Sequence, residues 1–261
     1  MSRVHIIGTP SAERVIQKSC TFNGTDEYMS LTSSITGDVT NQSLSFWVKP
    51  TNTSSGVIFE CYGTAAPADN FFRVTHSNQD ITIALESNNV ALYTASTTGD
   101  VVPSGSWTHV VLAQSGALGS ADSKVFINGV KQTLSAATTR DGWTIGAITG
   151  VAKFRFGANQ SAASFFAGSL AEIILGSVTG SNPDVTVNQY GISGSGTWKP
   201  KPFPKGSVLS GAGTAYTVNY DNHGFHLRFL DSASMGKDFS GIGHNFTLTN
   251  MDASNQSTSV P

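Results

Sequence analysis

The sequence is short of charge, of basic runs and of long apolar stretches. Only 12% of its 261 residues are charged, about half the usual share, and the formal net charge is −2 at pH 7. No run of Lys and Arg is present, which argues against a nucleic-acid surface or a polybasic membrane patch. No apolar stretch is long enough to span a bilayer, and the one at residues 4–7 is too short for a signal-peptide core. We therefore expect no nucleic-acid partner and no membrane insertion.

Cysteine is scarce as well. Cys20 and Cys61 are the only two in the chain, too few for a disulfide scaffold. Each stands in a stretch that alternates apolar and polar residues, so we favour two small buried core residues. A bridge between them, should two strands bring them together, is the alternative.

Paired acids are also missing. A retaining glycosidase needs two carboxyl groups about 5–5.5 Å apart, which a strand supplies from acids two or four positions apart. No two acids of this chain have that spacing, and its glutamates stand singly, at Glu13, Glu27, Glu60, Glu86 and Glu172. We expect no catalytic residues and no enzymatic activity.

What the chain has in quantity is short alternating stretches between polar turns. The alternation is clearest at residues 43–49, 80–87 and 106–129, where Asn128-Gly129 is a strong signal for a hairpin turn. Weaker stretches of the same kind cover residues 20–31, 56–61, 71–75, 90–96, 153–157 and 165–176. Strands this close together leave no room for helical crossovers, so they must pair antiparallel. The prediction is an all-β fold, a two-sheet antiparallel sandwich of jelly-roll type.

The residue pattern of the chain changes at both ends. Residues 1–16 lack strand alternation, and we expect an N-terminal arm. Residues 191–213 are rich in Gly, Ser and Pro, and residues 198–205 favour extended polyproline-like backbone. We therefore divide the chain into the arm, a sandwich domain at 17–178, and a strap with a short C-terminal module at 179–261.

The histidines raise the possibility of chemistry. Trp107 and His109 fall on one face of an expected strand, and we favour a structural role for both. His223 and His226, with Asp221 nearby, could form a metal site. On a strand, however, positions three apart point to opposite faces, which argues against chelation.

Calcium is a more plausible ion than zinc for these loops. Asp26 lies in the polar turn at residues 23–26, and Asp69-Asn70 forms a second candidate. The competing interpretation is that Asp and Asn occupy these turns for backbone reasons alone. We expect no cofactor beyond a possible structural calcium at Asp26.

Sugar recognition needs an aromatic platform and hydrogen-bonding amides, carboxylates or guanidinium groups. Two stretches have that composition, and they supply the candidate glycan-binding residues Tyr62, Asp69, Asn70, Arg73, Arg140, Asp141 and Trp143. The alternative is that Tyr62 and Trp143 cover the edge of the core or contact a neighbouring subunit.

Five segments in order carry a family resemblance. They are residues 19–28, 43–50, 105–111, 125–130 and 166–173. Together they resemble the laminin-G-like, concanavalin-like jelly-roll superfamily over about residues 17–178. Where that family usually has Asp-Glu in its closing motif, this chain has Ala171-Glu172. The departure puts in doubt any calcium ion that depends on the missing Asp.

A second resemblance lies further along the chain. Residues 222–248 are similar to a segment that follows laminin-G-like domains in virion proteins of marine tailed phages. The resemblance implies a non-enzymatic virion structural protein, of the tail or fibre type, made in the host cytoplasm and carried on the particle. A capsid decoration protein, a bacterial carbohydrate-binding module and an adaptor without a sugar site remain alternatives.

The same resemblance implies partners. The terminal arms would contact other virion proteins, the chain would form a homo-oligomer, and an exposed rim would contact a host surface glycan. Fold alone does not decide among these functions.

Overall fold

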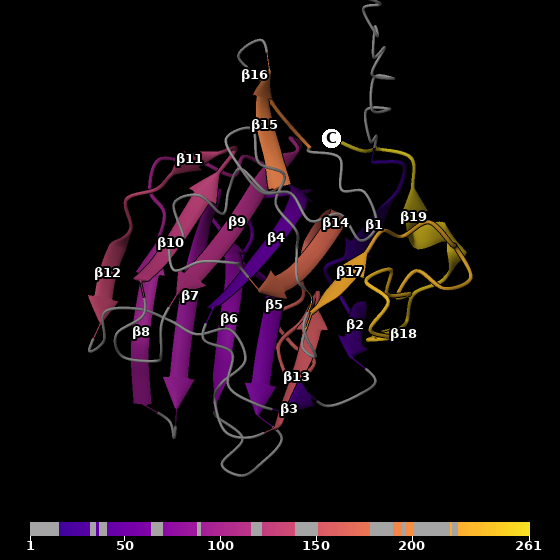
Figure 1. Ribbon diagram of the computed structural model, residues 1–261, viewed down its shortest axis with the longest axis horizontal. Coiled ribbons are helices and arrows are strands. Elements are labelled where there is room, and N and C mark those ends of the chain that lie inside the picture. The colour runs from indigo at the N-terminus through magenta and orange to yellow at the C-terminus, as the bar shows by residue number, and fades with distance from the viewer. Residues whose placement is uncertain are drawn as a thin grey trace, which may run out of the picture.

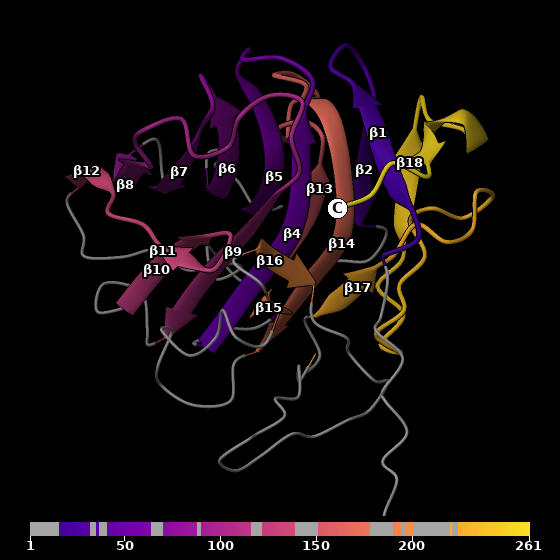
Figure 2. The same ribbon diagram turned by 90° about the horizontal axis from the view of Figure 1, so that it is seen from above.

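The computed structural model describes residues 16–31, 35–36, 41–63, 70–87, 90–115, 122–138, 151–177, 190–194, 197–200, 220 and 224–261. Two antiparallel sheets pack face to face, and the two layers are visible from above in Figure 2. This confirms the predicted jelly-roll sandwich. No helix in these ranges is long and apolar enough to cross a membrane.

The first sheet lies nearer the viewer in Figure 1. Its strands run in the order β11-β10-β9-β4-β14-β1-β19, and β17 also pairs with β14. Their bounds are β11 (Val130–Lys131), β10 (Asp122–Ile127), β9 (Thr108–Ser115), β4 (Asn41–Pro50), β14 (Ala167–Ser177), β1 (Ser19–Asn23), β19 (Gln256–Ser257) and β17 (Phe225–Leu227).

The second sheet runs in the order β12-β8-β7-β6-β5-β13-β2-β18, and β3 also pairs with β13. Its strands are β12 (Ser135–Thr138), β8 (Val90–Ser96), β7 (Asp80–Ser87), β6 (Phe71–Ser77), β5 (Gly56–Gly63), β13 (Val151–Phe156), β2 (Tyr28–Leu31), β18 (Phe246–Thr249) and β3 (Ile35–Thr36). A single 3-10 turn, η1 (Ala253–Asn255), precedes β19.

The core between the sheets follows from the alternation. In β7, Ile81, Ile83 and Leu85 are at most 1% exposed, while Thr82 and Ala84 between them face outward. At the other end of the sandwich the core is aromatic, with ring centroids 5.0–5.9 Å apart. Such pairs add to the gain from burial. The rings belong to Phe59, Phe154, Phe156, Phe225 and Phe246.

Two local predictions are confirmed in the core and at its edge. Cys20 and Cys61 are buried free thiols, on opposite sheets. Asn128 and Gly129 have φ angles of 47° and 80° and connect β10 to β11, which is the geometry that a two-residue type I′ hairpin requires.

The outer face of the first sheet is covered by the chain itself. The strands β15 (Gly191–Gly194) and β16 (Thr197–Pro200) pair with each other and lie outside this sheet in Figure 2. Trp198 packs there with buried Trp47 and Ala171. Ile16 and Val260, near the two ends of the chain, belong to the same cluster.

The C-terminal residues extend both sheets. β17 pairs with β14, β19 pairs with β1, and β18 pairs with β2, so residues 225–257 add strands to the sandwich that residues 19–177 build. The division of the chain at residue 178 stays a prediction.

Candidate functional site

A ladder of charged side chains crosses the outer face of the second sheet. Arg155 of β13 lies opposite Glu60 of β5, and Glu60 lies opposite Arg73 of β6. Their neighbours along each strand fill the core, so alternation directs these three side chains away from it. We call this set, together with Tyr28 and Tyr62 beside it, the sheet-face site.

Glu60 is the centre of the ladder. The residue is fully buried although it lies on the outer face, and its carboxylate accepts hydrogen bonds from Arg73 Nε and from the Gln160 backbone N–H at 2.7 Å. Burial raises the pKa of the Glu60 carboxyl, and the attraction of the two arginines offsets part of that effect. Glu60 therefore fixes Arg73 in place and is itself covered from solvent.

Arg155 acts as a support. Its Nη1 donates to the carbonyl oxygens of Asn159 at 2.6 Å and Gln160 at 3.0 Å, which ties the loop after β13 to the sheet. Its guanidinium carbon lies 4.4 Å from the centre of the Tyr28 ring and 5.6 Å from that of Tyr62. One cation thus holds two aromatic rings beside the ladder.

Arg73 is the ladder's outward-facing donor. Its guanidinium stacks 3.9 Å from the Phe71 ring centre, and its side chain is 24% exposed. Nε is engaged by Glu60, and its two terminal nitrogens make no hydrogen bond to any described residue. A fixed guanidinium with free donors is suited to acceptor oxygens of a ligand.

The arrangement offers groups that can bind a ligand. Hydrolysis of a glycosidic bond by the usual route needs two carboxyl groups across the bond. Both carboxylate oxygens of Glu60 are engaged, one by Arg73 Nε and the other by the Gln160 N–H. The site offers aromatic rings and fixed donors, with its one carboxylate turned to a structural role.

The structure brings together part of the predicted glycan set. Tyr62 and Arg73 both lie in the sheet-face site. Asn70 is 1% exposed at the start of β6, where its carbonyl oxygen accepts from the Gly63 N–H at 2.9 Å. The remaining candidates, Asp69, Arg140, Asp141 and Trp143, lie outside the described residues.

Three members of the site were missed from the sequence: Tyr28, Glu60 and Arg155. Alternation alone places Glu60 on the same face as Tyr62, and that signal was available. The proximity of Arg155 and Tyr28 depends on strand pairing, which the sequence does not give.

Asp26 lies in an exposed turn. Its Oδ1 accepts from the Asn23 amide at 2.8 Å, and its Oδ2 and backbone oxygen accept from the Asn250 amide at 3.2 Å. The Thr25 N–H donates to Asn23 Oδ1 at 2.8 Å, a pattern typical of an Asx turn. No group of three or more His, Cys, Asp or Glu that could hold a metal occurs among the described residues. Calcium at Asp26 stays a prediction.

His109 has the structural role that the sequence indicated. It is 1% exposed, stacks 4.8 Å from Trp47, accepts a 2.7 Å hydrogen bond from Trp198 Nε1 at Nδ1, and pairs through Nε2 with Ser45 Oγ at 2.9 Å. Nδ1 must be unprotonated to accept, so Nε2 carries the hydrogen. Burial lowers the pKa of His109 to about 3, which keeps the ring neutral.

His226 lies at the junction of β17 and β14. Its Nε2 lies 2.8 Å from the Glu172 carboxylate, and its Nδ1 lies 3.3 Å from the Tyr220 hydroxyl. Asp221 and His223, the other members of the suggested metal set, are outside the described residues. The visible role of His226 is to join the C-terminal strand to the closing motif.

The comparisons agree with this architecture. The profile of the concanavalin A-like lectin/glucanases superfamily, laminin-G type, matches residues 23–185. A search of curated proteins found no match.

Several solved structures are similar in fold. The native heptameric SAP-like pentraxin from Limulus polyphemus is 17% identical, with 68% of this chain and 83% of that chain covered and a TM-score of 0.50. The LG4-5 domains of mouse laminin α1 are 14% identical, with 62% and 41% covered and a TM-score of 0.44. The CBM40 of the Ruminococcus gnavus IT-sialidase, bound to α2,3 sialyllactose, is 17% identical, with 58% and 86% covered and a TM-score of 0.41. On the family profile, which spans more than half of its length, the chain belongs to the laminin-G type of the concanavalin A-like lectin/glucanases superfamily.

Proposed function

We propose that the protein is a non-enzymatic structural protein of a tailed-phage virion, of the tail or fibre type, that binds a host surface glycan through the sheet-face site. The observation that carries the glycan part is the fixed Arg73 guanidinium between Phe71 and Glu60, with Tyr62 held against Arg155 in the same ladder. The buried, hydrogen-bonded Glu60 is consistent with binding without turnover.

The physical argument is one of preorganisation. A sugar presents hydroxyl oxygens to hydrogen-bond donors and an apolar ring face to aromatic side chains. Glu60 and Arg155 already hold Arg73, Tyr28 and Tyr62 in position, so a ligand has little side-chain freedom to remove. The site is thereby suited to weak individual contacts that gain strength when several copies act together.

The virion part rests on the C-terminal resemblance and on geometry. Residues 222–248 resemble the phage segment, and Asp238 within them is a hub that accepts from the backbone N–H groups of His226 and Ser240. Ile16 and Val260 pack on the outer face of the first sheet, on the far side of the sandwich from the sheet-face site. Contacts to other virion proteins and between copies of the chain through the terminal arms would leave the glycan site accessible.

The test of glycan binding is Arg73→Lys. This change keeps a positive charge next to Glu60 and removes the forked donors, so we expect stability to be retained and glycan affinity to fall about tenfold. The measurement is binding of the full chain to a glycan microarray, followed by titration of the best ligand. Arg228→Lys is the matched control, because Arg228 also stacks on an aromatic ring, Phe239, at 5.5 Å, but lies outside the site.

The contradicting outcomes are distinct. Absence of any glycan ligand, or equal affinity of the Arg73→Lys variant, would exclude the sheet-face site as a lectin site. Release of shorter saccharides on incubation would exclude the non-enzymatic assignment. Immunogold labelling of intact particles tests the location: label at the tail supports the proposal, and label over the capsid lattice supports a decoration protein instead.

A further inference from the structure

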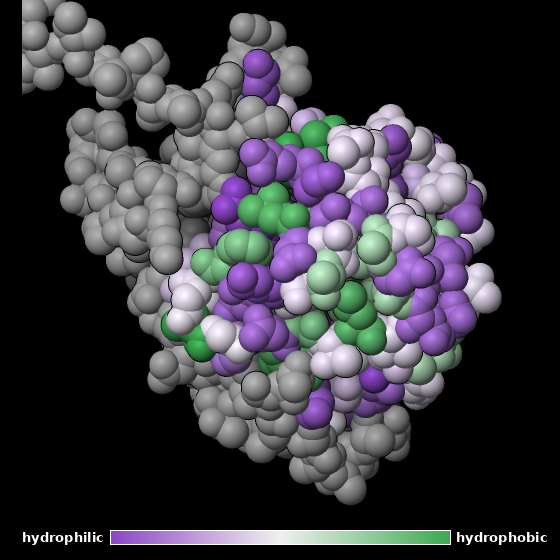
Figure 3. All heavy atoms as spheres, turned by 90° about the vertical axis from the view of Figure 1, so that its right-hand side faces the viewer, coloured by the Kyte–Doolittle hydropathy of each residue, from purple (hydrophilic) through white to green (hydrophobic). Residues whose placement is uncertain are grey.

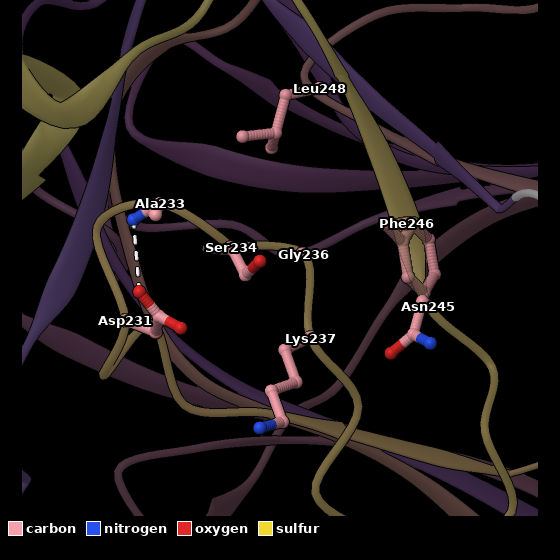
Figure 4. A pocket seen from close by; sticks show the side chains of 8 residues that line it. All are labelled: Asp231, Ala233, Ser234, Gly236, Lys237, Asn245, Phe246 and Leu248. Carbon is pink, nitrogen blue, oxygen red and sulfur yellow. Dashed lines mark hydrogen bonds between the residues drawn. The ribbon is translucent and has the colours of Figure 1, made fainter.

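The C-terminal segment lines an open hollow of about 560 Å³ that the sheet-face site does not use. Its volume is within the range of about 300–1,000 Å³ common for small-molecule sites. Two pieces of chain build it, the loop at residues 231–237 and the start of β18 (Figure 4). The lining residues are Asp231, Ala233, Ser234, Gly236, Lys237, Asn245, Phe246 and Leu248.

The walls of this pocket are fixed by backbone contacts. The Phe246 N–H donates to the Gly236 carbonyl at 2.8 Å, which ties the loop to β18. A Cβ on Gly236 would lie 2.0 Å from the Phe246 carbonyl oxygen, so only glycine permits this approach. Two turns, Ser234 N–H to Asp231 O at 3.0 Å and Lys237 N–H to Ser234 O at 2.9 Å, shape the loop. The hollow is therefore a built feature of the fold.

Asp238 locks the far side of the loop. Its carboxylate accepts from four backbone N–H groups, those of His226, Ser240, Gly243 and His244, at 2.8–3.0 Å. Partial burial acts against its charge, but these hydrogen bonds, with that from the Ser240 hydroxyl, hold the pKa of Asp238 below its ordinary value. The residue next to Lys237 is thus held in place by hydrogen bonds on the side of the loop away from β18's pocket wall.

Asp231 and Lys237 at the pocket are not paired with each other. Asp231 Oδ1 accepts from the Ala233 N–H at 3.0 Å, and its second oxygen makes no hydrogen bond to any described residue. Lys237 stacks 5.6 Å from the Phe239 ring centre, and no ion pair within 4.0 Å joins it to Asp231. In Figure 4 the side chains of Asp231, Ser234 and Lys237 come from the loop, across from β18.

The opposite wall offers the partly exposed Leu248 as its apolar surface, since the Phe246 ring is only 6% exposed and packs in the core. Phe246 and Leu248 of β18 line it, with Asn245 at its end. On the side of the molecule that carries β18 and β19, Figure 3 shows hydrophobic residues as separate spots among hydrophilic ones. A broad protein-docking surface does not fit this mosaic, whereas a small amphipathic ligand does.

We propose that this pocket binds a single sugar ring and is a second saccharide site, separate from the sheet-face site. A pyranose fits the two walls, because its hydroxyl groups can donate to Asp231 and accept from Lys237 and Ser234 while its C–H face packs on the partly exposed Leu248. A bare phosphate is disfavoured by the Asp231 carboxylate, and a lipid chain by the two charges. Two sugar sites on one domain increase avidity for a repeating polysaccharide.

The test is a titration of the isotopically labelled full chain, followed through backbone amide signals. The probes are the methyl glycosides of glucose, galactose and mannose, and N-acetylglucosamine, each up to about 50 mM so that a millimolar Kd is visible. We expect at least one of them to shift the amides of Ala233, Ser234 and Lys237 in a saturating manner. Glycerol is the control for a non-specific polyol effect.

Asp231→Asn is the deciding variant. It keeps an Oδ1 acceptor for the Ala233 N–H, so the turn is preserved, while loss of the charge weakens sugar binding about tenfold. Asp252→Asn is the matched control, since Asp252 caps the Ser254 N–H at 2.8 Å in the same way outside the pocket. Amide spectra and melting temperature establish that both variants are folded.

The inference is overturned by any of three results. The first is that none of the sugars shifts the pocket amides, and the second is that glycerol shifts them as strongly. The third is that the Asp231→Asn variant binds sugar as tightly as the unchanged protein. Shifts confined to the amides of β5 and β6 would support the sheet-face site and exclude the second one, so the two proposals fail separately.

Discussion

The two outer faces of the sandwich are built from the same strand pattern but hold different residues. On the first sheet, the outward positions of β4, β9 and β10 include Trp47, Val111 and Phe126, and the chain covers them with Trp198 and its neighbours. On the second sheet, the corresponding positions hold Glu60 and Arg73, together with Thr and Ser side chains that bond across strands, such as Thr82 and Ser96 at 2.9 Å. The apolar face gains stability by being covered, whereas the polar face satisfies its own charged and hydroxyl groups and leaves Arg73 partly exposed.

Because of this difference, substitutions on the two faces should change different properties of the protein. Burial of apolar area drives packing of the strap on the first sheet, since each square ångström removed from water contributes about 25 cal/mol. Charged and hydroxyl groups on the second sheet gain little from such covering and can exchange water for a ligand. Changes on the first face should therefore affect stability, and changes on the second should affect binding.

The largest effect should follow from Trp198→Ala. Loss of the indole removes apolar contacts with Trp47 and leaves His109 Nδ1 without its donor, so we expect the free energy of unfolding to fall by about 3 kcal/mol. Urea unfolding followed by near-UV circular dichroism measures it. Trp198→Phe, which keeps a ring and loses the N–H, should cost less. A loss below about 0.5 kcal/mol for the alanine variant, the level of an ordinary surface change, would mean that the strap does not stabilise this face.

The second-largest effect should be a dependence of the free energy of unfolding on pH, through His109 under the strap. The pKa of His109 is about 3 in the folded protein against an ordinary value of 6.5. Between these two pH values the unfolded chain binds a proton at His109 and the folded protein does not. Its contribution to stability is intact above pH 6.5 and falls by up to about 1.4 kcal/mol per unit as the pH drops from 6.5 toward 3.

His109→Gln isolates this contribution. The variant cannot titrate at this position, so the difference between its unfolding free energy and that of the unchanged protein should shrink by about 2 kcal/mol between pH 7 and pH 5. Urea unfolding of both proteins across that range is the measurement. A constant difference would show that His109 is accessible to protons in the folded state.

Much of the fold could be predicted from local rules. The inward set of β7 follows from strict alternation, and the β10–β11 hairpin follows from Asn128-Gly129. The role of His109 also followed from its place on a strand face. These features depend on residues close together in the sequence.

The sheet-face site could be predicted only in part. Tyr62 and Arg73 have the right chemistry for sugar, but their link to Arg155 depends on the pairing of β5 with β13, about ninety positions further on. The C-terminal pocket gave no sequence signal, because its walls are set by the close approach of Gly236 to Phe246. Long-range register and backbone approach are decided by global packing, which alternation does not encode.

The smallest effect compares two glycines with the same backbone strain. Gly129 and Gly105 have φ angles of 80° and 76°, so an alanine at either position incurs a similar conformational cost of about 1 kcal/mol. A Cβ at Gly129 would also lie 2.2 Å from the Trp198 ring, whereas a Cβ at Gly105 would meet no atom within 4 Å. Gly129→Ala should therefore destabilise by about 1 kcal/mol more than Gly105→Ala, because Trp198 must shift. Equal losses in urea unfolding would place Trp198 away from the hairpin in solution and would contradict the covering of the first sheet by Trp198.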